Sequence, residues 1–84
     1  MHYVYVLKSG KSGNLYIGCT SDLRRRFFEH NTDKARYTKN RGPYELIYYE
    51  AYKTKDDAFA REKNLKLRAN VLTGLKRRIV KSLV

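Results

Sequence analysis

Residues 16–31 read YIGCTSDLRRRFFEHN, and this stretch predicts a strand that leads directly into a helix. The run Leu15–Thr20 is rich in aromatic and β-branched side chains, as strands are. Ser21 or Asp22 can then cap a helix that continues to about Asn31, because their side chains accept hydrogen bonds from the first free N–H groups of a helix. The stretch therefore joins a strand to a helix across a short turn.

The predicted helix directs apolar and polar side chains toward the same region. Leu23, Phe27 and His30 recur on one face, which must pack against the strands. Arg26 lies four residues before His30 and beside this face. A guanidinium and an imidazole at the edge of a core indicate a polar cleft, although a histidine in such a position is also often a packed core residue.

A β-hairpin is predicted before this helix. The apolar run His2–Lys8 is separated from the next strand by Ser9–Asn14, a stretch of glycine, serine, asparagine and lysine. A four-residue loop at Ser9–Ser12 would place Tyr5 directly opposite Tyr16, on the same face of the hairpin. Both hydroxyls would then share one site, although tyrosine is also a common packing residue in strands.

The remainder of the chain predicts a third strand and two further helices, which gives the order β-β-α-β-α-α. This order is typical of the α+β class, here a small three-stranded antiparallel or mixed sheet flanked by helices. A short helical turn is expected at Ala35–Lys39. The other elements are a strand at Tyr44–Tyr52, a helix from Thr54, its cap, to about Ala69, and a last helix capped by Asn70 or Thr73 that ends at about Leu83.

Glu62 lies in the apolar stripe of the predicted helix that begins at Thr54. Burial of an unpaired carboxylate costs several kcal/mol. Either a bound cation or an ion pair with Lys66, one helical turn later, is therefore required. The apolar residues that surround Glu62 at helical spacing are Ala58, Phe59, Leu65 and Ala69.

Length and composition favour a single domain over residues 1–84, because 84 residues are too few for two hydrophobic cores. No apolar run approaches the roughly 20 residues that span a bilayer, and the first residues lack the features of a signal peptide. Cys19, the sole cysteine, excludes an internal disulfide and a structural zinc site. We therefore expect a cytoplasmic protein that does not bind membranes.

The chain is strongly basic, with 19 Lys and Arg against 8 Asp and Glu and a net charge of +11. Such an excess indicates a polyanionic partner, and nucleic acid is the first candidate. Charge by itself carries no information about catalysis. The basic residues that we expect to contact backbone phosphates are Arg24, Arg25, Lys39, Arg41, Arg77 and Arg78.

Three segments of the chain resemble the motifs of the GIY-YIG nuclease superfamily. Tyr3-Val4-Tyr5 and Tyr16-Ile17-Gly18 resemble the two motifs that name it, although Tyr3 stands where the name has glycine. Residues 16–31 resemble the family's second strand and first helix, and Arg61-Glu62-Lys63 resembles its third motif. The chain is most similar to the small stand-alone branch of predicted endonucleases.

This resemblance implies a metal-dependent endonuclease with Tyr5, Tyr16, Arg26 and His30 as catalytic residues. Glu62 would bind one Mg²⁺ or Mn²⁺ ion, Arg26 would stabilise charge on the phosphate, and His30 would relay a proton for a tyrosine that activates water. Many relatives also have an asparagine near the site, for which Asn64 and Asn70 are the candidates in this chain.

The expected partner is nucleic acid, DNA in preference to RNA, with branched, nicked or single-stranded DNA as candidate substrates because no sequence-reading domain is seen. Two other hypotheses about the function remain open. One is a nucleic-acid-binding module without catalysis, and the other is a subunit whose activity depends on a protein partner that supplies substrate specificity. Pure binding would not require a carboxylate in an apolar helix stripe, which favours the nuclease.

Overall fold

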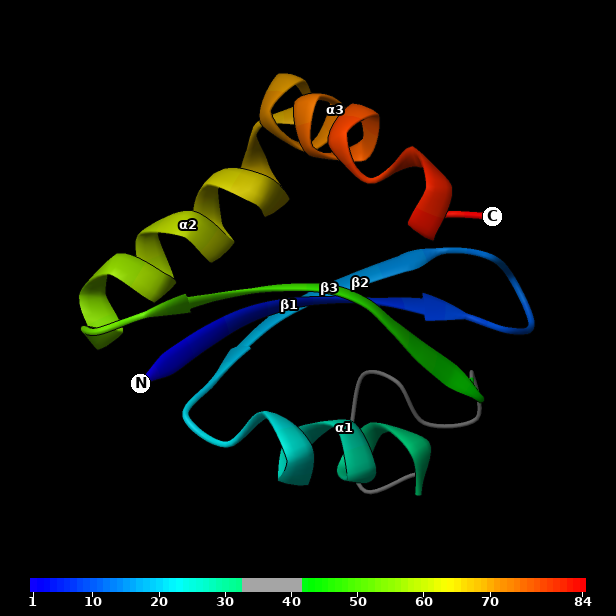
Figure 1. Ribbon diagram of the computed structural model, residues 1–84, viewed down its shortest axis with the longest axis horizontal. Coiled ribbons are helices and arrows are strands. Elements are labelled where there is room, and N and C mark those ends of the chain that lie inside the picture. The colour runs from blue at the N-terminus through cyan, green and yellow to red at the C-terminus, as the bar shows by residue number, and fades with distance from the viewer. Residues whose placement is uncertain (33–41) are drawn as a thin grey trace.

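The computed structural model describes residues 1–32 and 42–84, which form an α+β fold with the predicted order of elements (Figure 1). The helical turn expected at Ala35–Lys39 lies outside the described residues. None of the described helices is long and apolar enough to cross a membrane. The elements are β1 (His2–Ser9), β2 (Leu15–Thr20), α1 (Leu23–Asn31), β3 (Tyr44–Tyr52), α2 (Lys55–Leu67), α3 (Ala69–Arg78) and the short 3₁₀ helix η1 (Val80–Ser82).

The sheet has the strand order β2-β1-β3, and both strand pairs are antiparallel. β1 occupies the centre because it carries an unbroken apolar run, and its residues from Val4 to Leu7 are at most 1% exposed. The sheet that we predicted as antiparallel or mixed is therefore antiparallel throughout.

Helices cover both faces of this sheet, with α1 on one face and α2 and α3 on the other (Figure 1). Alternate residues of β1 serve the two faces. Tyr5 and Leu7 pack with Tyr44 on the α1 face. The cluster on the α2 and α3 face consists of Val4, Val6, Ile17, Ala58, Leu65 and Leu75.

Two of the predicted helix caps are confirmed. The side chain of Asp22 accepts a hydrogen bond from the N–H of Arg25 at the start of α1, and Thr54 accepts one from Asp57 at the start of α2. The prediction for α3 was wrong, because α3 follows α2 after the single residue Arg68, without a side-chain cap. The chain cannot use Asn70 or Thr73 as a cap, since both lie inside the helix.

The end of the last helix was also predicted too late. α3 ends at Arg78, and the chain continues as η1 rather than as α-helix to Leu83. The apolar face that we predicted for it is nevertheless present, since Leu75 is buried and Leu72 and Ile79 pack against the same core cluster.

The hairpin register differs from the prediction. The N–H of Ser9 donates to the carbonyl of Asn14 over 2.9 Å, so the loop is residues 10–13, and Gly13 adopts a left-handed φ of 73° in it. Tyr5 therefore lies opposite Gly18, and Tyr16 lies opposite Leu7. A loop one residue later changes the pairing by two residues, so the two tyrosines are diagonal neighbours that remain on one face.

A polar cluster around Glu50 ties α2 to β3. Its carboxylate accepts hydrogen bonds from the hydroxyls of Tyr48, over 2.6 Å, and Tyr52. Arg61 of α2 donates to both carboxylate oxygens, with Nε at 3.0 Å from Oε1 and Nη2 at 3.1 Å from Oε2. Burial alone would raise the pKa of Glu50, but Arg61 and the two hydroxyls outweigh it and hold the pKa below its ordinary value.

We predict that Glu50→Gln lowers the free energy of unfolding by about 1–2 kcal/mol at neutral pH, because Arg61 loses its charged partner. The pKa of Glu50 in the folded protein is below the ordinary value of about 4.3 that it has in the unfolded chain. Its contribution to stability is therefore fully present above about pH 4.3 and is lost as the pH falls through the folded-state pKa. Urea unfolding at a series of pH values measures this. Glu45→Gln, on the exposed side of β3, is the control. A difference between wild type and Glu50→Gln that stays constant with pH would contradict the prediction.

Candidate active site

A buried hydrogen bond joins β1 to α1. The Tyr5 hydroxyl and Nε2 of His30 are 2.9 Å apart, and both residues are 1% exposed. His30 faces the sheet because it shares a face of α1 with Leu23 and Phe27, which pack against the same cluster. Two of the predicted catalytic residues are therefore in direct contact.

Gly18 makes this contact sterically feasible. A Cβ atom at position 18 would lie 2.3 Å from the hydroxyl oxygen of Tyr5 and 2.4 Å from Cζ. Since Tyr5 and Gly18 are opposite each other in the hairpin, the tyrosine ring crosses the glycine on its way to His30. We did not predict this role for Gly18, although an isolated glycine within a strand signals the close approach of another group.

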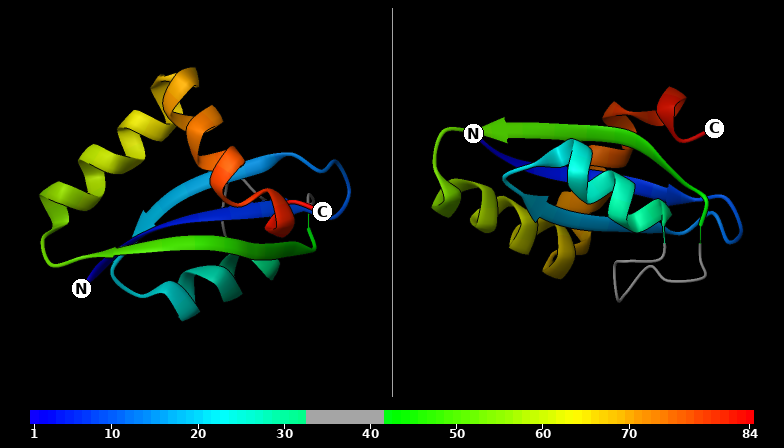
Figure 2. Two further views of the ribbon diagram at one scale, coloured as in Figure 1. Left: turned by 45° about the horizontal axis from the view of Figure 1, so that its top comes forward. Right: turned by 90° about the horizontal axis from the view of Figure 1, so that it is seen from below.

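Tyr16, on the edge strand β2, lies close to residues of α1 and of α2. Its ring centroid is 4.9 Å from that of His30 and 6.4 Å from that of Tyr5. Nζ of Lys66, on α2, lies 5.9 Å from the centroid of the same ring. In the right panel of Figure 2, α2 is on the β2 side of the sheet. The edge strand β2 thus brings Tyr16 close to both α1 and α2.

Arg26 is held at the site by Glu29. Its Nη1 lies 3.0 Å from Oε1 of Glu29, and Nε of Arg25 lies 3.5 Å from the other carboxylate oxygen. Arg26, and to a smaller extent Arg25, hold the pKa of Glu29 below its ordinary value. Glu29, which we had not singled out, is the pairing partner expected at i+3 and i+4 from the two arginines.

Glu62 is partly buried on the face of α2 that also carries Ala58 and Leu65. Its side chain is 20% exposed, and Oε2 lies 3.0 Å from Nζ of Lys66. The ion pair that was one of our two explanations is therefore present. Its carboxylate also lies close enough to Tyr5 to contribute to the raised pKa of that residue. Glu62 is therefore within electrostatic range of Tyr5.

The apolar stripe that we predicted around Glu62 is narrower than expected. Ala58 and Leu65 are buried, but Phe59 is 47% exposed. Ala69 is exposed as well and belongs to α3, not to α2. The prediction was wrong for Phe59 because it lies on the exposed side of α2, and for Ala69 because α2 ends at Leu67.

The donor set at Glu62 limits the kind of metal site that can form. Residues 1–32 and 42–84 contain no group of three or more His, Cys, Asp and Glu side chains that could hold a metal ion. Mg²⁺ is often bound by one or two carboxylates, with waters and substrate phosphates as its other ligands. The partly exposed Glu62 carboxylate fits such a site. Asn64 and Asn70, the candidates for a further ligand, are exposed on α2 and α3.

Burial disfavours the charged forms of both contacting residues, so it raises the pKa of Tyr5 and lowers the pKa of His30. Burial raises the pKa of Tyr5 to about 12, although the neighbouring Arg26 guanidinium acts against this shift. Burial, with a further contribution from Arg26, lowers the pKa of His30 to about 4. Both groups are therefore neutral at pH 7. A neutral imidazole accepts a hydrogen bond at one ring nitrogen and donates one at the other.

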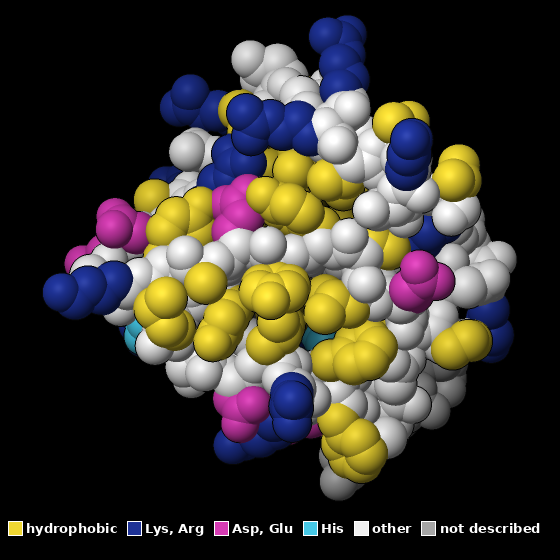
Figure 3. Space-filling view, in the orientation of Figure 1, with side chains coloured by type: hydrophobic (Ala, Val, Ile, Leu, Met, Phe, Trp, Pro, Cys, Tyr) yellow, Lys and Arg dark blue, Asp and Glu magenta, His cyan; other side chains and the backbone are white. Residues whose placement is uncertain are grey.

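The predicted phosphate-contacting residues are dispersed over the molecule. Arg24 and Arg25 lie on α1, whereas Arg77 and Arg78 end α3 on the other face of the sheet (Figure 1). Lys39 and Arg41 lie outside the described residues. In the view of Figure 3, Lys and Arg side chains gather above and below a band of apolar side chains at the level of the sheet. The basic character is thus not confined to the candidate site.

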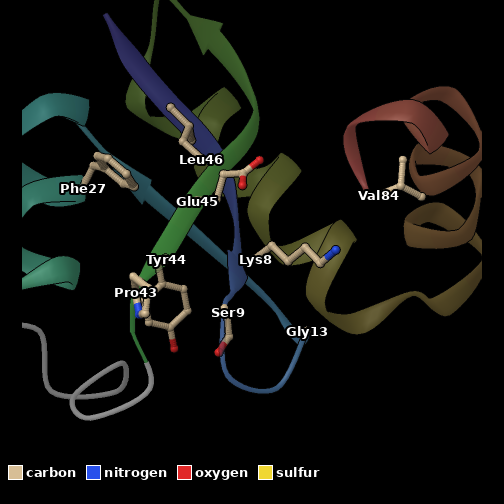
Figure 4. Close-up of a pocket in the computed structure, with 10 residues that line it drawn as sticks. Lys8, Ser9, Gly13, Phe27, Pro43, Tyr44, Glu45, Leu46 and Val84 are labelled. Carbon is tan, nitrogen blue, oxygen red and sulfur yellow. The ribbon is translucent and has the colours of Figure 1, made fainter.

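Two of the hollows on the described surface differ in character. A polar one, of about 300 Å³, adjoins the candidate site and is lined by Cys19, Thr20, Ser21, Asp22, Arg25, Arg26 and Glu29. A larger one, of about 880 Å³, lies at the hairpin end of the sheet (Figure 4). It contains none of the five predicted residues, and its Lys8 ammonium is bound to the carbonyl of Leu83. The smaller, polar hollow is therefore the better candidate for the substrate site, because Arg26 lines it.

Comparison with known proteins gives consistent matches. The family model described as the GIY-YIG catalytic domain matches residues 1–74. UPF0213 proteins of Staphylococcus saprophyticus and Staphylococcus epidermidis are 42% and 46% identical over 66 residues, which are 77% of this chain and 79% of each relative. The solution structure of a UPF0213 protein from Bacillus halodurans is 33% identical, with a TM-score of 0.57 over 93% of this chain and 85% of that one. The names of these relatives state no activity.

We predict that Gly18→Ala destabilises the fold by about 1–3 kcal/mol, because the added methyl group occupies the place of the Tyr5 ring. Urea unfolding measures the loss. In a Tyr5→Ala background the same substitution should cost much less, since the ring that it displaces is absent. Equal losses in the two backgrounds would show that Gly18 is needed for a reason other than the Tyr5 ring.

We predict that His30 makes stability depend on pH between its ordinary pKa of 6.5 and about 4. In this window the unfolded chain binds a proton that folded His30 does not, so stability falls with falling pH, by on the order of 2–3 kcal/mol. The ring signals of His30 in NMR spectra should titrate with a midpoint near 4. Unfolding of His30→Gln should show a weaker pH dependence. A midpoint near 6.5 would contradict the buried, neutral imidazole.

Proposed function

Because the chain belongs to the GIY-YIG family, we propose that it is a metal-dependent endonuclease that hydrolyses phosphodiester bonds in DNA. The observation that carries this proposal is the contact between Tyr5 and His30 with Tyr16 beside them. Arg26 of α1 and Glu62 of α2 both act electrostatically on Tyr5, and Lys66, the ion-pair partner of Glu62, lies 5.9 Å from the centroid of the Tyr16 ring. Acid–base, cationic and carboxylate groups thus surround one place, as phosphodiester hydrolysis requires. We propose further that residues 1–84 act as one domain on branched, nicked or single-stranded DNA.

Glu62 is the residue that would hold the divalent cation, Mg²⁺ or Mn²⁺. When bound, the cation supplies Lewis-acid polarisation of the phosphate. Lys66 must then release the carboxylate, and its ammonium becomes free to contact phosphate. Arg26 likewise exchanges Glu29 for the non-bridging phosphate oxygens, which its planar guanidinium matches better than a point charge does.

The Tyr5–His30 contact supplies a route for the proton of the attacking water. Tyr5 itself is a poor base, because burial raises its pKa to about 12. It can accept the water proton if its own proton moves to Nε2 of His30, 2.9 Å away, in the tautomer with the proton on Nδ1. The phenol then stays neutral and the imidazole becomes positively charged. The water oxygen forms its bond to phosphorus as the bond from phosphorus to the leaving sugar oxygen breaks, and the leaving oxygen takes a proton from solvent. Phosphate beside Arg26 offsets the resulting positive charge. Tyr16 orients the water.

A second candidate function is nucleic-acid binding without cleavage. The net charge of +11 favours it. Basic residues also lie on helices at both faces of the sheet, on α1 and at the end of α3 (Figure 1). Binding of this kind depends on phosphate contacts and weakens steeply with salt. A protein partner that supplies substrate specificity is compatible with either function.

The test compares cleavage of labelled flap, nicked, single-stranded and duplex DNA, and of RNA, with and without Mg²⁺ or Mn²⁺. We predict metal-dependent cleavage that falls at least about a hundredfold in Glu62→Gln and in Tyr16→Phe, because each removes a group that acts on the reacting phosphate or water. Glu45→Gln, which changes an exposed carboxylate of β3, is the matched control and should cleave like wild type.

Two outcomes would decide against the nuclease. Equal cleavage by wild type, Glu62→Gln and Tyr16→Phe would refute the assignment of the site. An absence of cleavage on all substrates, together with salt-sensitive binding, would favour the binding module.

A further inference from the structure

An exposed pair of aromatic rings lies one strand away from Tyr5. Tyr49 of β3 is directly opposite Tyr5 in the antiparallel register, so both side chains are on the α1 face of the sheet. Tyr49 is 53% exposed. The ring of Tyr3 meets it edge to face, with centroids 6.1 Å apart and planes at 65°. This pair extends the tyrosines of the candidate site toward the free edge of the sheet.

Packing does not account for Tyr49. The neighbouring tyrosines of β3 have structural roles, since Tyr48 and Tyr52 bind Glu50 and Tyr44 is buried in the α1-side cluster. Tyr49 belongs to neither of the two core clusters of the described residues. A large aromatic side chain that is half exposed and unused by the core is available to bind a ligand.

The two rings line a hollow that is also lined by a basic residue. The hollow has a volume of about 350 Å³ and is lined by Tyr3, Ser21, Asp22, Leu23, Arg24 and Tyr49. Arg24 is the cationic residue among those that line it. The Asp22 carboxylate accepts a hydrogen bond from the N–H of Arg25 as the cap of α1. Aromatic rings beside an arginine form the combination that binds a nucleobase and its phosphate.

We propose that Tyr49, Tyr3 and Arg24 form a stacking subsite for one unpaired nucleobase of the strand that is bound at Tyr5. Tyr49 stacks on the base, Tyr3 supports its ring, and Arg24 binds the adjacent phosphate. A base must leave its own stack to reach such a ring, so the subsite favours single-stranded or flapped nucleic acid over intact duplex. The inference rests on the proposed function, because it takes nucleic acid as the ligand.

The experiment measures binding of fluorescently labelled oligothymidine of 12 nucleotides and of a 12-base-pair duplex, by anisotropy in EDTA so that no cleavage occurs. We expect Tyr49→Leu to weaken binding of the oligothymidine about tenfold, which is the size of one base stack, and binding of the duplex less than twofold. Tyr49→Phe keeps the ring and should bind the oligothymidine within about twofold of wild type. Arg24→Gln should weaken oligothymidine binding even if Tyr49→Leu does not fold.

The subsite is overturned if Tyr49→Leu, shown to be folded by its thermal transition, binds oligothymidine like wild type. It is also overturned if the loss is equal for oligothymidine and duplex, or if Arg24→Gln has no effect. These results are independent of the nuclease assay, because binding in EDTA does not require cleavage. A protein that cleaves DNA but is indifferent to Tyr49→Leu would refute the subsite alone.

Discussion

The hydrogen bond between the Tyr5 hydroxyl and His30 is the interaction on which the rest of the candidate site depends. Two polar groups that are removed from water must bind each other, and this requirement fixes how α1 lies over the sheet. The same placement directs Arg26 toward the tyrosine and requires glycine at position 18. It also keeps the imidazole neutral and therefore able to accept a proton. One contact thus links the fold to the proposed chemistry.

A second fixed point lies on the opposite face of the sheet. The bidentate pair between Glu50 and Arg61 sets the position of α2 against β3, and Glu62 is the next residue along that helix. The candidate site therefore combines residues from helices on both faces of the sheet, on either side of Tyr16 in the edge strand β2. Tyr16 connects them, since its ring contacts His30 on one side and the Lys66 partner of Glu62 on the other.

The sequence allowed the local features to be predicted and left the long-range ones open. The strand Tyr44–Tyr52 and the Asp22 cap follow from composition and from short spacings, which act within a few residues. The pairing of Tyr5 was predicted wrongly because several loops fit the same turn residues, and each gives another register. The role of Gly18 as space for that ring depends on this register. The contacts of Glu50 depend on how a helix docks on a strand, which no local pattern specifies.

The central claim is that side chains from both faces share one site with Glu62. Paramagnetic broadening by Mn²⁺, added with thymidine monophosphate, tests it most directly, because this phosphate is not a diester and stays intact. The account predicts that NMR signals of Tyr5, Tyr16, Arg26 and Glu62 broaden together, and that Glu62→Gln abolishes the effect. Broadening centred on other carboxylates, such as Asp56, or broadening that persists in Glu62→Gln, would contradict it.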